Sequence, residues 1–436
     1  MTINNSITDR LHPQNWPFSL EMLPQPAYMV GGAVRDAILG RSREYLDLDF
    51  IIPDQAVKVA RAIAKNYHAG FVLLDAQRNI ARVVFPHATA DFAQQEGESL
   101  FTDLHRRDFT INAIAYNPHT QEIIDPLQGC ADIETGILRM ISPKNLKDDP
   151  LRLMRAYRQA AQLNFTIEPT TQATIRSLAA DISQVASERV RVEIGYLLDI
   201  SNGTEWLSTA REDGLLAKFF TNAASENLQK LAAVDQATSL IIEKWPELEK
   251  ELQTPVRDTI KTTWLGIAKL ACLVHSDPEK AEIELLEITY SRAEIRGVTT
   301  ILRMFSQLQK AGDLSLREQY FLFYDLGNVF SATLVFALAD DILRVKGDTL
   351  QNYENLINRY LNPDDLVAHP VPLVKGKDVM LSLNIPASPL VGKILSEIAI
   401  AQAEGKINTV QEALEFAKLV TGDWGLGTGD WGLGTG

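Results

Sequence analysis

Hydrophobic and polar residues follow two different periods along the chain, and the change falls near residue 143. Between residues 28 and 142, short apolar runs and two-residue alternation are typical of strands, with a few helical stretches between them. From residue 143 to 360, apolar residues recur at helical spacing almost without a break. We therefore expect an α+β multidomain protein, with a small mixed-sheet head followed by an all-α remainder.

The expected elements follow from these periods. Strands are predicted at 28–30, 46–52, 71–74, 81–85, 88–92 and 122–124, and helices of the head at 33–39, 54–66 and 108–116. Further helices are predicted at 150–163, 169–180, 187–200, 203–212, 225–244, 257–273, 279–285, 291–311, 315–345 and 350–360. Two or three more are expected within 374–419. No fixed repeat period is visible, which argues against a solenoid.

Composition narrows the class of protein. The chain has 436 residues, with 46% hydrophobic and 22% charged residues, as in ordinary globular proteins of more than one domain. Its net charge of −14 argues against a non-specific nucleic-acid coat protein. Cys130 and Cys272 form no zinc or disulfide pattern, and there is neither a signal peptide nor an apolar run approaching 18 residues. We expect a cytoplasmic location and no membrane contact.

The segment 28–52 carries the first chemical pattern. Asp47 and Asp49 alternate with apolar residues on a predicted strand, so both carboxylates share one face. Two such carboxylates repel unless a divalent cation lies between them, and Mg²⁺ takes a few carboxylates while leaving room for phosphate oxygens. Upstream, Gly31 and Gly32 let the backbone approach an anion, and Arg35 lies one helical turn further on. This outline predicts a nucleotidyl-transfer site.

GGAVRDAILG followed by LDLDF resembles the signature of the class II tRNA nucleotidyltransferase and bacterial poly(A) polymerase family. The resemblance implies a head at 28–142, a helical neck at 143–204, a body at 205–360 and a tRNA-binding tail at 361–420. Residues 1–27 are expected to be an irregular lead-in, and the glycine- and tryptophan-rich repeat at 421–436 a disordered end.

A second motif, RRDFTINA, matches the same family. Arg107 can bind phosphate with two parallel donors, and Asp108 can accept from a ribose hydroxyl or cap a helix. The resemblance implies sugar and phosphate contacts for both residues. Asn112 is expected to support them from behind.

The segment KDDPLRLMRAYRQ predicts a helix with polar residues at three-residue spacing, namely Asp149, Arg152, Arg155 and Arg158. A carboxylate that accepts from an exocyclic amino group and a guanidinium that donates to the adjacent ring nitrogen would suit cytosine and adenine. Uracil and guanine reverse that order and leave both groups unpaired. The segment resembles the family's EDxxR element, in which Asp149 and Arg152 would read the base.

Two further stretches are predicted to support the site. SERVRVE resembles the family's ERxxxE element, in which Arg189 and Glu193 would hold the base-reading helix. Asp91, on a neighbouring strand, is a candidate third carboxylate that helps to activate the attacking hydroxyl, or else a plain strand-end residue.

The resemblance implies an enzyme that uses two Mg²⁺ ions, with CTP and ATP as substrates and tRNA as partner, to build or repair the 3′ CCA end. Only AQQEGESLFTDLH separates Asp91 from RRD. In the shortness of this segment the chain resembles the CC-adding members of the family, which leave the last A to a separate enzyme. CC addition and full CCA addition both stay open, as do a poly(A) polymerase and a non-catalytic RNA-binding protein.

Overall fold

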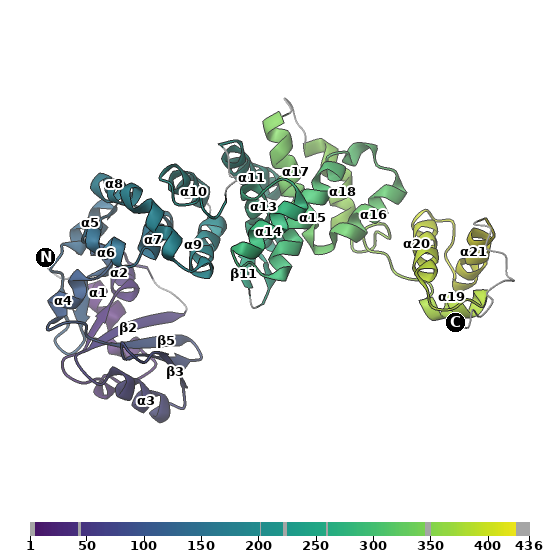
Figure 1. Ribbon diagram of the computed structural model, residues 1–436. Helices are drawn as coiled ribbons and strands as arrows, with labels where there is room; N and C mark the ends of the chain where they lie inside the picture. The colour runs from purple at the N-terminus through teal and green to yellow at the C-terminus, as the bar shows by residue number, and fades with distance from the viewer. Residues whose placement is uncertain are drawn as a thin grey trace, which may run out of the picture. The chain divides into compact units, whose positions relative to one another are not determined.

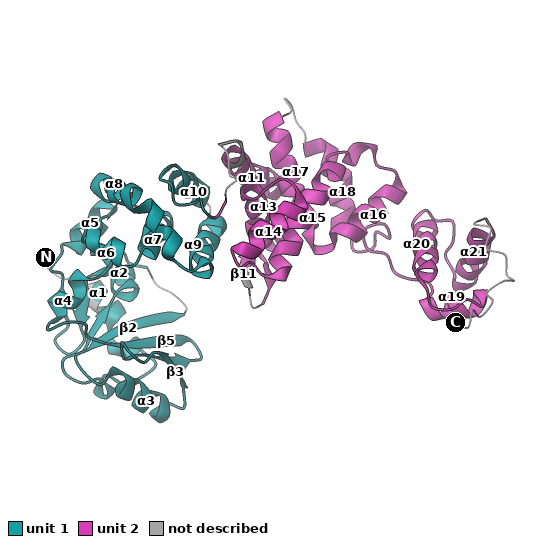
Figure 2. Ribbon diagram, in the orientation of Figure 1, with its two compact units in different colours: residues 1–218 teal, residues 219–436 magenta. Residues whose placement is uncertain are grey.

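A computed structural model describes residues 5–41, 45–200, 202–220, 225–258, 260–344 and 350–423 (Figure 1). The predicted disorder of 421–436 falls almost entirely outside these residues. The chain divides into two compact units, residues 1–218 and 219–436 (Figure 2).

Unit 1 is built on a seven-stranded sheet with the strand order β3-β4-β5-β2-β1-β6-β7. The pair β2 and β5 is parallel and the other neighbours are antiparallel, which confirms the predicted mixed sheet. The strands are β1 Tyr28–Val30, β2 Leu46–Ile52, β3 Gly70–Asp75, β4 Ile80–Phe85, β5 Ala88–Gln94, β6 Ala115–Asn117 and β7 Glu122–Ile124.

Short helices surround this sheet, and the N-terminal segment takes part in its core. Trp16 and Phe18 pack against Phe50, and Phe18 also contacts Phe85 and Phe92. The lead-in is therefore an integral part of the head, because these buried rings cover one face of the central strands. The helices of this part are α1 Asn5–Leu11, α2 Gly32–Ile38, α3 Ala56–Asn66, α4 Leu100–His105 and α5 Gly129–Thr135.

The predicted helix at 108–116 is wrong. Only the short 3-10 turn η3, Thr110–Asn112, forms there, and the chain then enters β6, which pairs with β1 and β7. Ala115 and Tyr116 are fully buried in the sheet. Burial of these two side chains outweighs the local helical spacing.

Helices complete unit 1 after residue 142. They are α6 Pro143–Asp148, α7 Leu151–Leu163, α8 Pro169–Leu178, the 3-10 helix η4 Ala179–Gln184, α9 Ser187–Asp199 and α10 Gly203–Glu212. Two short strands, β8 Ile137–Leu138 and β9 Thr166–Ile167, form a parallel pair. Tyr157 of α7 donates to Asp213, which also accepts from Gln172 and Arg176. The buried Asp213 carboxylate thus joins α7, α8 and the end of α10.

Unit 2 is almost entirely helical. Its helices are α11 Ser225–Lys244, α12 Glu247–Gln253, α13 Trp264–Leu273, α14 Pro278–Glu287, α15 Arg292–Leu308, α16 Leu316–Leu326, α17 Phe330–Arg344, α18 Glu354–Leu361, α19 Gly376–Leu383, α20 Pro389–Ala403 and α21 Val410–Asp423.

Two predicted helices of this unit need correction. The stretch 257–273 starts as a hairpin of β10 Pro255–Arg257 and β11 Ile260–Thr263, and helix begins only at Trp264, after Thr263 caps it. The stretch 315–345 is broken at Gly327, where φ is +45°.

By length and composition, Leu316–Arg344 could cross a bilayer, but 72% of its most apolar window is buried, as in the core of a globular domain.

Candidate active site

The two carboxylates of β2 lie in its first half, and Asp49 is paired with Asp91 of β5. Asp47 is exposed and accepts a hydrogen bond of 2.8 Å from Thr89 Oγ1, whereas Asp49 is partly buried. Burial, followed by the nearby charges of Asp47 and Asp91, raises the pKa of Asp49 to about 7, against the opposing effect of Arg107 and Arg82. This crowding of negative charge fits a divalent cation, which would stabilise both carboxylates in their ionised form.

Gly31 approaches this site more closely than another residue could. Its φ is +73°, and a Cβ at this position would lie 3.2 Å from Asp49 Oδ2 and 3.6 Å from Arg107 Nη1. The glycine therefore brings the turn between β1 and α2 against the carboxylate and leaves the first amides of α2 beside it.

Arg35 does not point to an open surface. It is buried, and it donates to Asn112 Oδ1 at 2.8 Å and to Asp36 Oδ1 at 2.8 and 3.0 Å. Asn112 in turn donates to Asp108 Oδ1 and to Gln159 Oε1, at 2.9 Å each. Arg35 thus connects α2 to the RRDFTINA segment through Asn112, and its Nη2 lies 3.6 Å from where a Cβ on Gly32 would be.

Asp108 is also enclosed. Its Oδ2 lies 3.0 Å from Arg155 Nη2, and its Oδ1 accepts from Asn112 and from the backbone N–H of Phe109. Burial alone would raise the pKa of Asp108, but Arg155 and these two hydrogen bonds outweigh burial and hold the pKa below its usual value. Asp108 therefore orders the segment and the helix α7, and its carboxylate is not presented to solvent.

Arg107 lies between the sheet and a pocket. Its Nη1 donates to the carbonyl of Asn112 at 3.3 Å and its Nη2 lies 3.6 Å from Asp103. Its Nε is buried without a hydrogen-bond partner among the described residues. Of the two adjacent arginines, Arg106 is exposed and pairs with Glu96, so Arg107 is the one placed near Asp49.

The base-reading candidates share that pocket. Asp149 and Arg152 line a cavity of about 420 Å³ together with Arg107 and Arg189, a size typical of small-molecule sites. Arg152 Nη1 donates to the carbonyls of Arg106 and Asn145, at 2.9 and 3.0 Å. Arg189 Nη2 lies 3.5 Å from Asp149 Oδ2. The pocket thus brings Asp149 and Arg152 to Arg107, some forty positions earlier in the chain, whereas Gly32, Asp47 and Asp49 line another cavity.

The three arginines predicted along α7 make different contacts. Arg155 is taken by Asp108, and Arg158 donates to Glu193 Oε2 at 2.5 Å and to Gln162 at 2.7 Å. Both therefore hold α7 in place, and of the row only Arg152 borders the pocket among the described residues.

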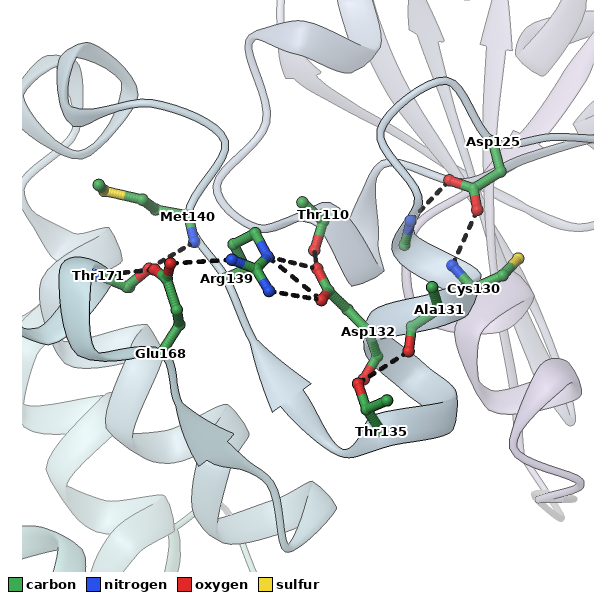
Figure 3. A network of polar contacts seen from close by, with 11 residues as sticks. Thr110, Asp125, Cys130, Ala131, Asp132, Thr135, Arg139, Met140, Glu168 and Thr171 are labelled. Carbon is green, nitrogen blue, oxygen red and sulfur yellow. Dashed lines mark hydrogen bonds and ion pairs between the residues drawn. The ribbon is translucent and has the colours of Figure 1, made fainter.

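One network was not foreseen from the sequence. Arg139 donates to Asp132 and to Glu168 Oε1, and Asp132 also accepts from Thr110 at 2.6 Å (Figure 3). Glu168 caps α8, so these contacts join η3 and α5 to the helices that follow. The weak signal in the sequence is the charge of Glu168 directly before Pro169, which marks a helix start.

Taken together, a mixed sheet with paired carboxylates, a glycine turn and a flanking arginine pocket defines a nucleotidyltransferase. Family models agree: the poly A polymerase head domain matches residues 27–139, the probable RNA and SrmB-binding site of polymerase A matches 164–226, and the putative tRNA nucleotidyltransferase domain 2 matches 259–417.

Similar proteins narrow the family. The chain is 47% identical to the CC-adding tRNA nucleotidyltransferase of Synechocystis, over 93% of this chain and 96% of the relative. It is 29% identical to the A-adding tRNA nucleotidyltransferase of Deinococcus radiodurans, over 92% and 96%. The Thermotoga maritima CCA-adding enzyme complexed with tRNA shares the fold, with a TM-score of 0.65, 20% identity and 91% of each chain covered. The chain belongs to the tRNA nucleotidyltransferase family, enzymes that add nucleotides to the 3′ end of tRNA.

Proposed function

We propose that this enzyme is of the CC-adding kind and transfers two CMP units from CTP to tRNA, releasing pyrophosphate each time. The observation that carries this proposal is the 47% identity to the Synechocystis CC-adding enzyme over almost the whole of both chains. The short link between β5 and α4, residues 95–99, supports it. We also propose a cytoplasmic location and a separate enzyme that adds the final A.

Full CCA addition is the second candidate. At 29% identity the relatives include an A-adding enzyme, so likeness at that level does not separate the kinds of addition. Sizing the product made from tRNA that lacks CCA, with CTP and ATP both present, tests the proposal. Growth by two nucleotides is the expected result. Growth by three indicates CCA addition, and long A tails indicate a poly(A) polymerase.

We infer that Asp47 and Asp49 hold the Mg²⁺ ions. Bound there, the metal would polarise phosphoryl oxygens and stabilise the charge of the leaving pyrophosphate. The support is the pairing of both carboxylates on one strand and the raised pKa of Asp49. Asp91 stays a prediction as the group that assists the attacking 3′-hydroxyl, since it lies opposite Asp49 in the strand pairing.

The triphosphate is proposed to lie over Gly31 and Gly32, where helix amides point outward, and to meet Arg107. The unpartnered Nε of Arg107 supports this assignment. Arg35 and Asp108 are proposed to act indirectly, by fixing Asn112 and α7, because both are buried in hydrogen bonds.

Base selection is proposed to rest on Asp149 and Arg152. The Asp149 carboxylate would accept from the N4 amino group of cytosine, and Arg152 would donate to N3. Both side chains line one pocket with Arg107, which supports one nucleotide that contacts all three residues. Arg189 is proposed to orient Asp149, and Glu193 to hold α7 through Arg158.

A further inference from the structure

Strand pairing lines up three charged side chains on one face of the sheet. Arg82 of β4 lies directly opposite Asp91 of β5, and Asp91 lies directly opposite Asp49 of β2. Directly paired residues on neighbouring strands have their side chains on the same face, close enough to interact. Arg82 was not among the residues that the sequence pattern suggested.

Arg82 donates two hydrogen bonds to Asp91. Its Nε lies 2.6 Å from Asp91 Oδ1 and its Nη2 lies 2.8 Å from Oδ2. Side-chain exposure is 39% for Arg82 and 18% for Asp91, so the pair is partly shielded from water. Parallel bonds of this kind fix orientation as well as charge, and a lysine cannot form them.

The two hydrogen bonds from Arg82 affect which carboxylates can bind a metal ion. Asp47, Asp49 and Asp91 lie on the paired strands β2 and β5, but among the described residues no three such side chains are placed to hold one metal ion. Both oxygens of Asp91 accept from Arg82, whereas Asp47 accepts one hydrogen bond, from the hydroxyl of Thr89. Asp47 and Asp49 are therefore available to a cation, whereas Asp91 is restrained by Arg82.

We propose that Arg82 is a positioning residue that keeps Asp91 out of the metal's ligand set and directed toward the acceptor's hydroxyl. This inference rests on the proposed metal site at Asp47 and Asp49. A carboxylate that is held by a guanidinium keeps its charge and a fixed direction, which suits orientation of a hydroxyl. Outer contacts of this kind typically change metal affinity or activity about 10- to 100-fold when lost.

The test measures Mn²⁺ binding by isothermal titration of the full chain, without nucleotide or tRNA. Arg82→Lys preserves the charge but releases one oxygen of Asp91, so Mn²⁺ is expected to bind several-fold more tightly. At the same time kcat should fall about tenfold or more, with the KM for CTP unchanged. Arg61→Lys, at an arginine that packs over Phe71 in the same unit, is the control and should change neither quantity.

Unchanged Mn²⁺ affinity in Arg82→Lys would overturn the proposal, whatever happens to kcat. A second variant, Arg82→Gln with Asp91→Asn, removes both charges and leaves the net charge as it was. Because Asp91 is not a ligand in this account, Mn²⁺ affinity should stay within about threefold of the wild type, and a tenfold loss contradicts it. Failure of the underlying metal site is separate, because then Asp47→Ala with Asp49→Ala would leave Mn²⁺ binding intact.

Discussion

Asp108 and Arg155 form an ion pair between the RRDFTINA segment and α7, with Oδ2 and Nη2 3.0 Å apart. The carboxylate is almost fully buried, and the pair fixes the RRDFTINA segment against α7, the helix that carries Arg152. The carboxylate that the sequence suggested would touch the ribose is therefore engaged by Arg155, Asn112 and the backbone of Phe109.

Loss of Arg155 should destabilise the protein. Arg155→Ala leaves the buried Asp108 carboxylate without its counter-charge, and since the arginine is about a third exposed we expect a loss of about 2–3 kcal/mol in the free energy of unfolding. Urea unfolding of both proteins measures it. Lys144→Ala, which breaks an exposed pair with Asp148, should change stability by less than about 0.5 kcal/mol. Equal effects of the two changes would rule out the buried pair as a stabilising contact.

The same pair predicts a pH dependence. The pKa of Asp108 is lower in the folded protein than its ordinary value of 3.8, so the unfolded chain takes up this proton first as pH falls. The stabilisation is thus complete above pH 3.8 and is lost below it, as the pH falls through the folded-state pKa. The difference in unfolding free energy between wild type and Asp108→Asn should shrink over that range. A difference that grows toward acid contradicts the assignment.

Gly31→Ala should damage both stability and activity. At φ +73° and ψ −138° the backbone of Gly31 lies in a region that is strained for alanine, at about 1–3 kcal/mol, and the new Cβ would lie 3.2 Å from Asp49 Oδ2. We expect a fall in kcat of about tenfold or more, because carboxylate geometry is disturbed. Gly195→Ala, in the helix α9 with open space around it, should instead stabilise by about 0.5–1 kcal/mol with activity retained. Full activity in Gly31→Ala would exclude a close approach to the site.

Asp149→Asn should relax base selection. The amide can turn either its oxygen or its N–H₂ toward the base, so uracil would no longer leave an unpaired carboxylate. The ratio of kcat/KM for CTP over UTP is expected to fall about 10- to 100-fold, equivalent to one buried polar group. Asp54→Asn is the matched control, since Asp54 is exposed and does not line the pocket around Asp149. An unchanged ratio in Asp149→Asn would mean that base reading lies elsewhere.

Most strands of the head and most helices of the remaining chain could be predicted. The spacing of apolar residues and the positions of glycines determine these elements locally. The strand with Asp47 and Asp49 alternates clearly, and β2 has the predicted bounds. The helix expected at 108–116 failed because burial of Ala115 and Tyr116 depends on strands from elsewhere in the chain.

The site, like the fold, could be predicted only in part. Residue types together with the family resemblance suggested Asp49, Arg107, Asp149 and Arg152 as members of one site. They could not show that Arg35, Asp108, Arg155 and Arg158 are occupied by partners, because those partners lie in other elements. Arg82 was missed for the same reason, since only strand register brings it to Asp91.

The most direct measurement of the central claim compares wild type with Asp47→Ala/Asp49→Ala on tRNA that lacks its 3′ end. Nucleotide addition and tRNA binding are followed separately, by product sizing and by filter binding. The double variant is expected to add no nucleotide while binding tRNA about as well as the wild type. Addition of nucleotides at a normal rate by the double variant would contradict it.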